Sequence, residues 1–166
     1  MKRILITVLI IFLTSSITVF AQDSMVLKAG ISKINSVPKQ FFGTWQVKST
    51  LITTDSPKNF KPSSADMWNL RRSGNVIELR NPMTGAVAEI YLNDVNNNDI
   101  TFSHEQKEEN MKLTDTVKLR LNGNTFTGTN ELTLKQKKIY GDQYEIVTKT
   151  AKYKIEGQKI SGTSIY

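Results

Sequence analysis

Residues 113–123 read Leu-Thr-Asp-Thr-Val-Lys-Leu-Arg-Leu-Asn-Gly, and this stretch decides the fold. Apolar residues alternate with Thr, Lys and Arg, which is the period of a β-strand with one buried face. Asp115 alone interrupts the apolar side. Asn122-Gly123 is the strongest short hairpin signal, because both residues tolerate the positive φ that a tight turn requires. The stretch therefore predicts a strand that turns back directly into an antiparallel partner starting at Phe126.

The same alternation continues along the chain between turn residues, and a charged loop is expected at residues 105–110. Strands joined by tight turns are antiparallel neighbours, and a sheet of many strands closes because closure removes exposed edges. The sequence predicts an all-β, antiparallel up-and-down β-barrel of about 8–9 strands, with a two-sheet β-sandwich as the alternative. The roughly nine expected strands cover residues 45–54, 68–72, 76–80, 86–92, 100–104, 113–121, 126–139, 144–156 and 159–165.

An internal similarity links residues 121–129 with residues 155–163. Both segments read apolar, polar, Gly, two polar residues, apolar, hydroxyl, Gly, Thr. The pattern predicts that Gly123 and Gly157 occupy equivalent turn positions with positive φ, and that the second Gly of each segment relieves a bulge or barrel bend. We interpret the similarity as repeated hairpin geometry and not as a repeated ligand site.

The start of the chain has the pattern of a secretory signal over residues 1–21. A basic start, Met1-Lys2-Arg3, precedes an apolar stretch, and Val19-Phe20-Ala21 resembles a cleavage site. Removing this segment from the 166 residues leaves about 145, enough for one domain. We therefore expect an exported protein, periplasmic or secreted, with a tail at residues 22–38 and one barrel domain at 39–166.

Composition excludes several kinds of chemistry. The chain has no Cys and one His, which excludes disulfides, a thiol nucleophile and a multi-histidine metal centre within one chain. Asp94, Asn96, Asn98 and Glu105 have the spacing of a calcium loop, but Asp99 stands where that loop needs Gly. An Asn-rich hairpin turn explains these residues better. No phosphate loop or nucleophile elbow is present, so we expect neither an enzyme nor a cofactor.

The charge is basic and dispersed. The 22 Lys and Arg exceed the 15 Asp and Glu by 7, and loss of Lys2 and Arg3 leaves an excess of 5. The densest run is Lys135-Gln136-Lys137-Lys138. Such a surface favours contact with an anionic envelope surface. Nucleic acid is not expected as a partner, because no aromatic residues alternate with the basic ones as in stacking platforms.

Phe41-Phe42-Gly43-Thr44-Trp45-Gln46-Val47 resembles the opening strand of the calycin superfamily, the lipocalins and fatty-acid-binding proteins. Those barrels begin with Gly-x-Trp after a short turn. The resemblance implies that Trp45 plugs the closed end of the barrel and that a small apolar ligand binds inside. A second lipocalin motif has only a loose relative in residues 140–144. The arginine that covers the Trp in that family would have to be replaced here by Lys149, Lys152 or Lys159.

The candidate ligand-binding residues combine large apolar side chains with polar ones on inward faces. Burying an unpaired carboxylate is costly, so Asp115 implies a partner or water inside the barrel. It either pairs with Lys or Arg near a strand end or makes a polar contact in a ligand cavity. His104 is expected at the barrel mouth, without a catalytic role. The candidates are Trp45, Phe102, His104, Asp115, Phe126 and Asn130.

Three functions remain open on these observations. The leading hypothesis is an exported, non-catalytic, monomeric protein that holds a small apolar or amphipathic ligand in a lipocalin-like barrel. The second is a module with a filled core that acts through its surface, as an inhibitor or adhesion partner. The third is a small outer-membrane barrel, which the polar face of most strands disfavours. Interior volume separates the first two hypotheses.

Overall fold

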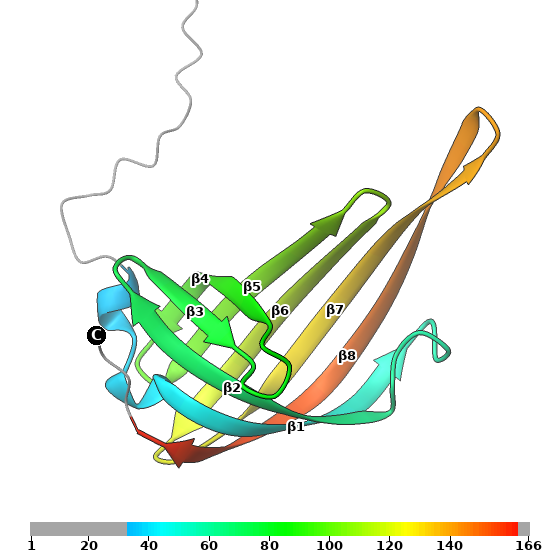
Figure 1. Cartoon of the computed structure of the whole chain (residues 1–166). Helices are drawn as coiled ribbons and strands as arrows, with labels where there is room; N and C mark the ends of the chain where they lie inside the picture. Colours follow the sequence, from blue (N-terminus) through cyan, green and yellow to red (C-terminus); the bar gives the residue numbers. More distant parts are fainter. Residues whose placement is uncertain (1–32, 163–166) are drawn as a thin grey trace, which may run out of the picture. The chain divides into compact units, whose positions relative to one another are not determined.

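Eight antiparallel strands follow one another in chain order around a closed barrel (Figure 1). The computed structural model describes residues 33–162. Each strand pairs with its neighbours in the chain, and β8 returns to pair with β1. The predicted all-β up-and-down barrel is thus confirmed, and the sandwich is excluded. The strands are β1 (Gly43–Thr54), β2 (Ser63–Ser73), β3 (Val76–Arg80), β4 (Val87–Asn96), β5 (Asp99–Glu108), β6 (Met111–Asn122), β7 (Thr125–Tyr140) and β8 (Gln143–Ser161).

Two short 3₁₀ helices precede the barrel, η1 (Lys33–Ser36) and η2 (Lys39–Phe41). Ile34 of η1, Phe41 of η2 and Val37 between them are buried in the core. The described part of the expected tail therefore packs against the barrel, because its apolar residues complete the core. The expected signal at residues 1–21 lies outside the described residues.

The predicted charged loop at residues 105–110 is wrong. β5 and β6 continue as a paired ladder to Glu108 and Met111, and only Glu109-Asn110 forms the turn. The charges are compatible with strands because this part of the sheet is exposed to solvent. For example, Lys112 Nζ lies 2.7 Å from Glu105 Oε1.

The predicted ninth strand is also wrong, because β8 runs without interruption to Ser161. Gly123 has a φ of 58° in its turn, as expected, but Gly157 lies inside β8 and pairs with Val47 and Phe126. A Cβ at Gly157 would lie 2.1 Å from Phe126 Cε1. Gly157 therefore makes room for an aromatic ring, and the repeated sequence pattern serves two different structural purposes.

Unequal strand lengths give the barrel a slanted rim. β3 has 5 residues, whereas β7 has 16 and β8 has 19. The wall is low at β3 and β4, and the β7–β8 hairpin extends well beyond the rest of the sheet (Figure 1). This asymmetry separates a short closed end from a wide open end.

Candidate functional site

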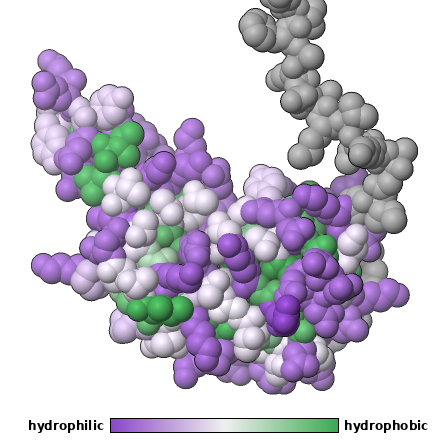
Figure 2. Space-filling model, turned by 180° about the vertical axis from the view of Figure 1, so that it is seen from behind, coloured by the Kyte–Doolittle hydropathy of each residue, from purple (hydrophilic) through white to green (hydrophobic). Residues whose placement is uncertain are grey.

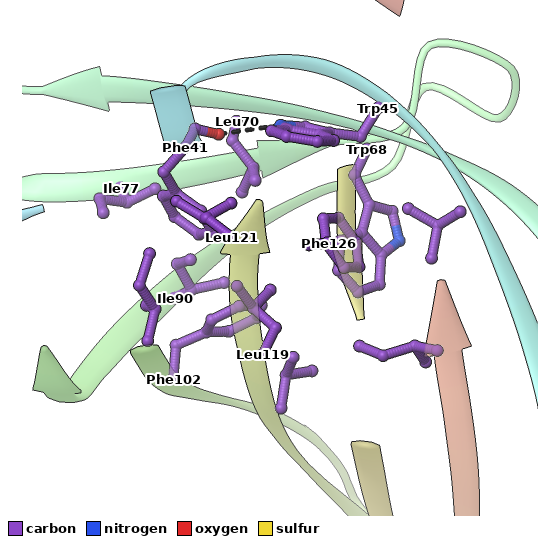
Figure 3. Packing of buried hydrophobic residues seen from close by; sticks show 14 of the residues in the cluster. Phe41, Trp45, Trp68, Leu70, Ile77, Ile90, Phe102, Leu119, Leu121 and Phe126 are labelled. Carbon is purple, nitrogen blue, oxygen red and sulfur yellow. Dashed lines mark hydrogen bonds between the residues drawn. The ribbon is translucent and has the colours of Figure 1, made fainter. Parts of the chain in front are cut away.

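The closed half of the barrel is filled by aromatic side chains from five different segments (Figure 3). Trp45 is fully buried and donates its Nε1–H to the Phe41 carbonyl at 2.9 Å. Its ring centroid lies 5.1 Å from that of Phe126. Trp68 stacks on Phe126 at 5.9 Å and meets Phe102 edge-on at 6.2 Å. Three of the candidate residues, Trp45, Phe102 and Phe126, therefore form the floor of the barrel.

Lys159 covers Trp45 from the side of β8. Its Nζ lies 5.2 Å from the centroid of the Trp45 ring and donates to the Gln40 carbonyl at 2.7 Å. Burial lowers the pKa of Lys159. The other two lysines considered for this position have other partners: Lys149 donates to Gln136 Oε1 at 2.7 Å and Lys152 lies 3.0 Å from Glu131 Oε1.

Above the aromatic floor, several inward-facing residues stay partly exposed. Strand alternation places Leu113 above buried Val117 on β6, and Leu132 and Leu134 above buried Phe126 on β7. Leu51 of β1 takes a similar position, and Leu51, Leu132 and Leu134 pack against the core. Leu113 and Leu134 lie beyond the level at which β8 pairs with β1 and β4 pairs with β5, so the ring of strands is open there. Their partial exposure therefore marks the rim of the barrel.

Asp115 and Asn130 mark the boundary between the filled and open halves. Asn130 pairs with Val117 in the β6–β7 ladder, and Asp115 lies one inward position above Val117. Oδ1 of Asp115 and Oδ1 of Asn130 are both buried without a hydrogen-bond partner. Burial raises the pKa of Asp115 to about 6, and a hydrogen bond from the Asn130 side chain acts in the opposite direction. The boundary thus holds two hydrogen-bond acceptors that lack a donor.

His104 stands directly opposite Asp115 in the β5–β6 register and is partly buried. The sequence analysis placed His104 at the barrel mouth without pairing it with Asp115. The signal was present, because a two-residue turn at Glu109-Asn110 fixes the register that brings His104 opposite Asp115. The structure thus brings His104, Asp115 and Asn130 to one region of the wall, above the three aromatic candidates.

The residues with calcium-loop spacing form the β4–β5 hairpin turn. Asn96 pairs with Asp99, and Asn97 adopts a φ of 53° at the turn. Among residues 33–162, no three His, Cys, Asp or Glu side chains gather in a way that could hold a metal ion. The hairpin interpretation therefore explains the acidic and amide residues of this segment.

A groove of about 810 Å³ runs across β2, β1, β8 and β7. Its lining includes the outward-facing side chains of Gln46, Lys48, Thr127 and Glu156. The two inward-facing residues Val47 and Phe126 reach it but are buried. The groove is therefore a feature of the outer wall and is separate from the boundary at Asp115.

The part of the chain that the structure describes contains no helix long and apolar enough to span a bilayer. Comparison of the chain with protein-family models, with curated proteins and with solved structures finds no significant match.

Proposed function

We propose that this chain is an exported, non-catalytic binding protein that holds a small amphipathic molecule in the open half of its barrel. One observation carries the proposal: one oxygen of Asp115 and one of Asn130 are buried without donors, directly above the aromatic floor of the barrel. A buried acceptor without a partner costs about 1–3 kcal/mol. A ligand that supplies a donor at this level removes that cost.

The chemistry of the wall suggests how such a ligand is oriented. Its polar end carries a hydroxyl or amine that donates to Asp115 or Asn130. Its apolar part lies against Leu51, Leu132 and Leu134, which are partly buried around the lumen. At neutral pH most Asp115 side chains are ionised, since the pKa is about 6. An amine that is protonated at that pH then gains a charge-assisted hydrogen bond.

A lipocalin-like origin of this barrel is part of the proposal. Trp45 occupies the closed end, and Lys159 covers its ring, at the place where the resemblance expects an arginine. The outer wall supports a role outside the bilayer. It carries ion pairs such as Arg120 with Asp99 at 2.6 Å, whereas the outward face of a membrane barrel is apolar.

A filled floor alone would also suit a module that acts only through its surface. The open upper half distinguishes the two functions, because a filled-core module has no reason to bury acceptors without donors. The lumen therefore favours ligand binding as the primary function.

Native mass spectrometry of the chain, purified without detergent from its own export pathway, tests the proposal. We expect an adduct of a few hundred daltons that is lost on organic extraction. Asp115→Leu should abolish it, because that variant removes the acceptor. Asp99→Ala is the matched control: Asp99 is on the outer wall, bound to Arg120, and its loss should leave the adduct in place. A bare wild-type mass, together with no uptake of a dansylated long-chain amine, would overturn the proposal.

A further inference from the structure

The β7–β8 hairpin leaves part of β8 without a neighbour on one side. Pairing with β1 ends at Thr54 and Ala151. Just beyond, Asp55 N–H donates to the Thr150 carbonyl at 3.3 Å, and Thr150 N–H donates to Asp55 Oδ1 at 2.8 Å. Residues 143–149 continue to pair with β7 alone. The other side of this segment is a free edge.

The backbone direction at Thr150 identifies the groups on that edge. Both the N–H and the C=O of Thr150 point to the β1 side. Backbone direction alternates along a strand, so Tyr144, Ile146 and Thr148 point the same way. Each presents one donor and one acceptor beyond the end of β1. This edge can therefore accept one more antiparallel strand.

Two other unpaired edges in the described barrel are protected. On β5, pairing with β4 ends at Ser103, and the next residues include Glu105, Lys107 and Glu108. Charges of this kind discourage strand addition. On β2, the side chain of Asp66 accepts a hydrogen bond from Asn81 of the β3–β4 loop, which lies over that edge. The β8 edge carries a single charge, Glu145, between Tyr144 and Thr148, and it reads Tyr-Glu-Ile-Val-Thr, which is rich in residues that favour strands.

An apolar face accompanies the free edge. Ile139 stands opposite Tyr144 in the β7–β8 register, and Ile146 follows on the same face. These side chains are 60%, 63% and 59% exposed, and Lys137 Nζ lies 4.6 Å from the centroid of the Tyr144 ring. Figure 2 shows apolar side chains gathered on the projecting part of the molecule. Edge and face together form a surface that a partner would cover.

We propose that the partner is a second copy of this chain, joined edge to edge along β8 around a two-fold axis at Ile146. In this register Ile146 faces its own copy and Tyr144 faces Thr148 of the second copy. A two-fold interface requires such self-complementarity. Pairing adds about six backbone hydrogen bonds, two at the axis and two at each flanking pair.

The sequence of the edge supports pairing with itself. Glu145 faces Val147 of the second copy and Gln143 faces Lys149, so no like charges stand directly opposite each other. The apolar strips of both hairpins join across the axis. The hairpin also reaches beyond the barrel rim (Figure 1), which leaves room for two barrels on either side of the joined sheet. This dimer departs from the monomer that the sequence suggested, and it does not depend on a ligand in the lumen.

Sedimentation equilibrium of the exported chain measures the association directly. We expect a dimer with a dissociation constant in the micromolar range. Ile146→Pro removes an N–H on the free edge while sparing the ladder with β7, and it should weaken the dimer by about 30-fold or more. A wild-type chain that stays monomeric at about 100 µM, or a folded Ile146→Pro variant that dimerises as well as wild type, would overturn the proposal.

Cysteine cross-linking tests the register even if the proline variant fails to fold. The described chain has no cysteine of its own. Ile146→Cys brings two thiols together at the axis, at a Cα separation of about 5.5 Å that suits a disulfide. Ile139→Cys is the matched control, since Ile139 is equally exposed on the same face but lies off the edge.

We expect the Ile146→Cys chain to form a disulfide-linked dimer about 10-fold faster than the Ile139→Cys chain. Equal rates would overturn the edge pairing. So would a monomer that sediments with phosphatidylglycerol vesicles, which would assign the apolar face to a lipid surface.

Discussion

The two ends of this barrel handle buried polar groups in opposite ways. At the closed end, Trp45 Nε1–H reaches the Phe41 carbonyl and the Lys159 ammonium reaches the Gln40 carbonyl. At the start of the open half, Asp115 and Asn130 each bury an oxygen without a partner. Apolar packing is also complete at one end and partial at the other. The closed end is therefore a packed core, whereas the open end keeps two buried acceptors without a donor.

The closed and open ends also differ in the lengths of the strands that form them. The short β3 and the 3₁₀ helices lie toward the closed end, which the turn at Gly74 and buried Ile34 help to complete. The long β7 and β8 carry the open end outward. The tip of this hairpin, residues 137–146, pairs only with itself and buries no side chain, so it adds little to the stability of the barrel.

Trp45→Ala should break the closed end and have the largest effect. Trp45 is fully buried and contacts Phe126, so its removal leaves a cavity in a packed region. We expect a loss of about 3–5 kcal/mol in the free energy of unfolding, measured by chemical denaturation. Ile139→Ala, at an exposed position of the open end, is the control and should change stability by less than about 0.5 kcal/mol. Equal effects at the two sites would contradict the division of the barrel.

Gly157→Ala should disturb the same floor by overpacking. The added Cβ would lie 2.1 Å from Phe126 Cε1, whereas a Cβ at Gly162 meets nothing within 4 Å. We expect Gly157→Ala to cost about 3 kcal/mol, at the upper end for overpacked cores, and Gly162→Ala to be nearly neutral. Thermal unfolding monitored by tryptophan fluorescence distinguishes them. A neutral Gly157→Ala would show that the Phe126 ring is free to move.

The alternation of residues was sufficient to predict the barrel and most of its strands, because period and turn chemistry are local properties. The β6 pattern and the hairpin after it are confirmed, but Asn122 pairs with Thr125, so the turn lies at Gly123-Asn124 and only Gly123 has a positive φ. Gly157 was misassigned because the sequence does not show that Phe126 lies over it. A glycine in a turn and a glycine under an aromatic ring look the same in one sequence.

The sequence was enough to select the residues of the candidate site, but not to predict which of them contact one another. Inward-facing positions follow from alternation, so Asp115 and Asn130 could be selected as polar interruptions. Whether they found partners depended on strands far away in sequence. The pairing of His104 with Asp115 depended on the length of one turn, which charged residues concealed. Local sequence patterns therefore predict single strands, but not which residues of distant strands face each other.

Asp115→Asn should stabilise the start of the open half, because it removes the cost of burying the Asp115 carboxylate. Burial raises the pKa of Asp115 from 3.8 to about 6, so the folded state binds the proton more tightly than the unfolded chain. This contribution to stability is fully present below pH 3.8 and is lost as pH rises through about 6. The ligand-free variant should therefore gain about 1–3 kcal/mol over wild type at pH 7, with the gain shrinking towards pH 4. Denaturation curves across this pH range measure it, and a gain independent of pH would contradict the assignment.

His104→Ala should have the smallest effect, although His104 faces Asp115. The His104 side chain is partly exposed near the open end, and Oδ1 of Asp115 has no hydrogen-bond partner. His104→Ala should therefore lower the free energy of unfolding by less than about 0.5 kcal/mol. A double-mutant cycle with Asp115→Asn makes this a test of the pair, because it isolates their interaction from the loss of packing. Coupling above about 1 kcal/mol would mean that His104 already supplies the donor. Asp115 would then have a hydrogen-bond donor without a ligand. The two ends of the barrel would no longer differ in how they satisfy this buried polar group.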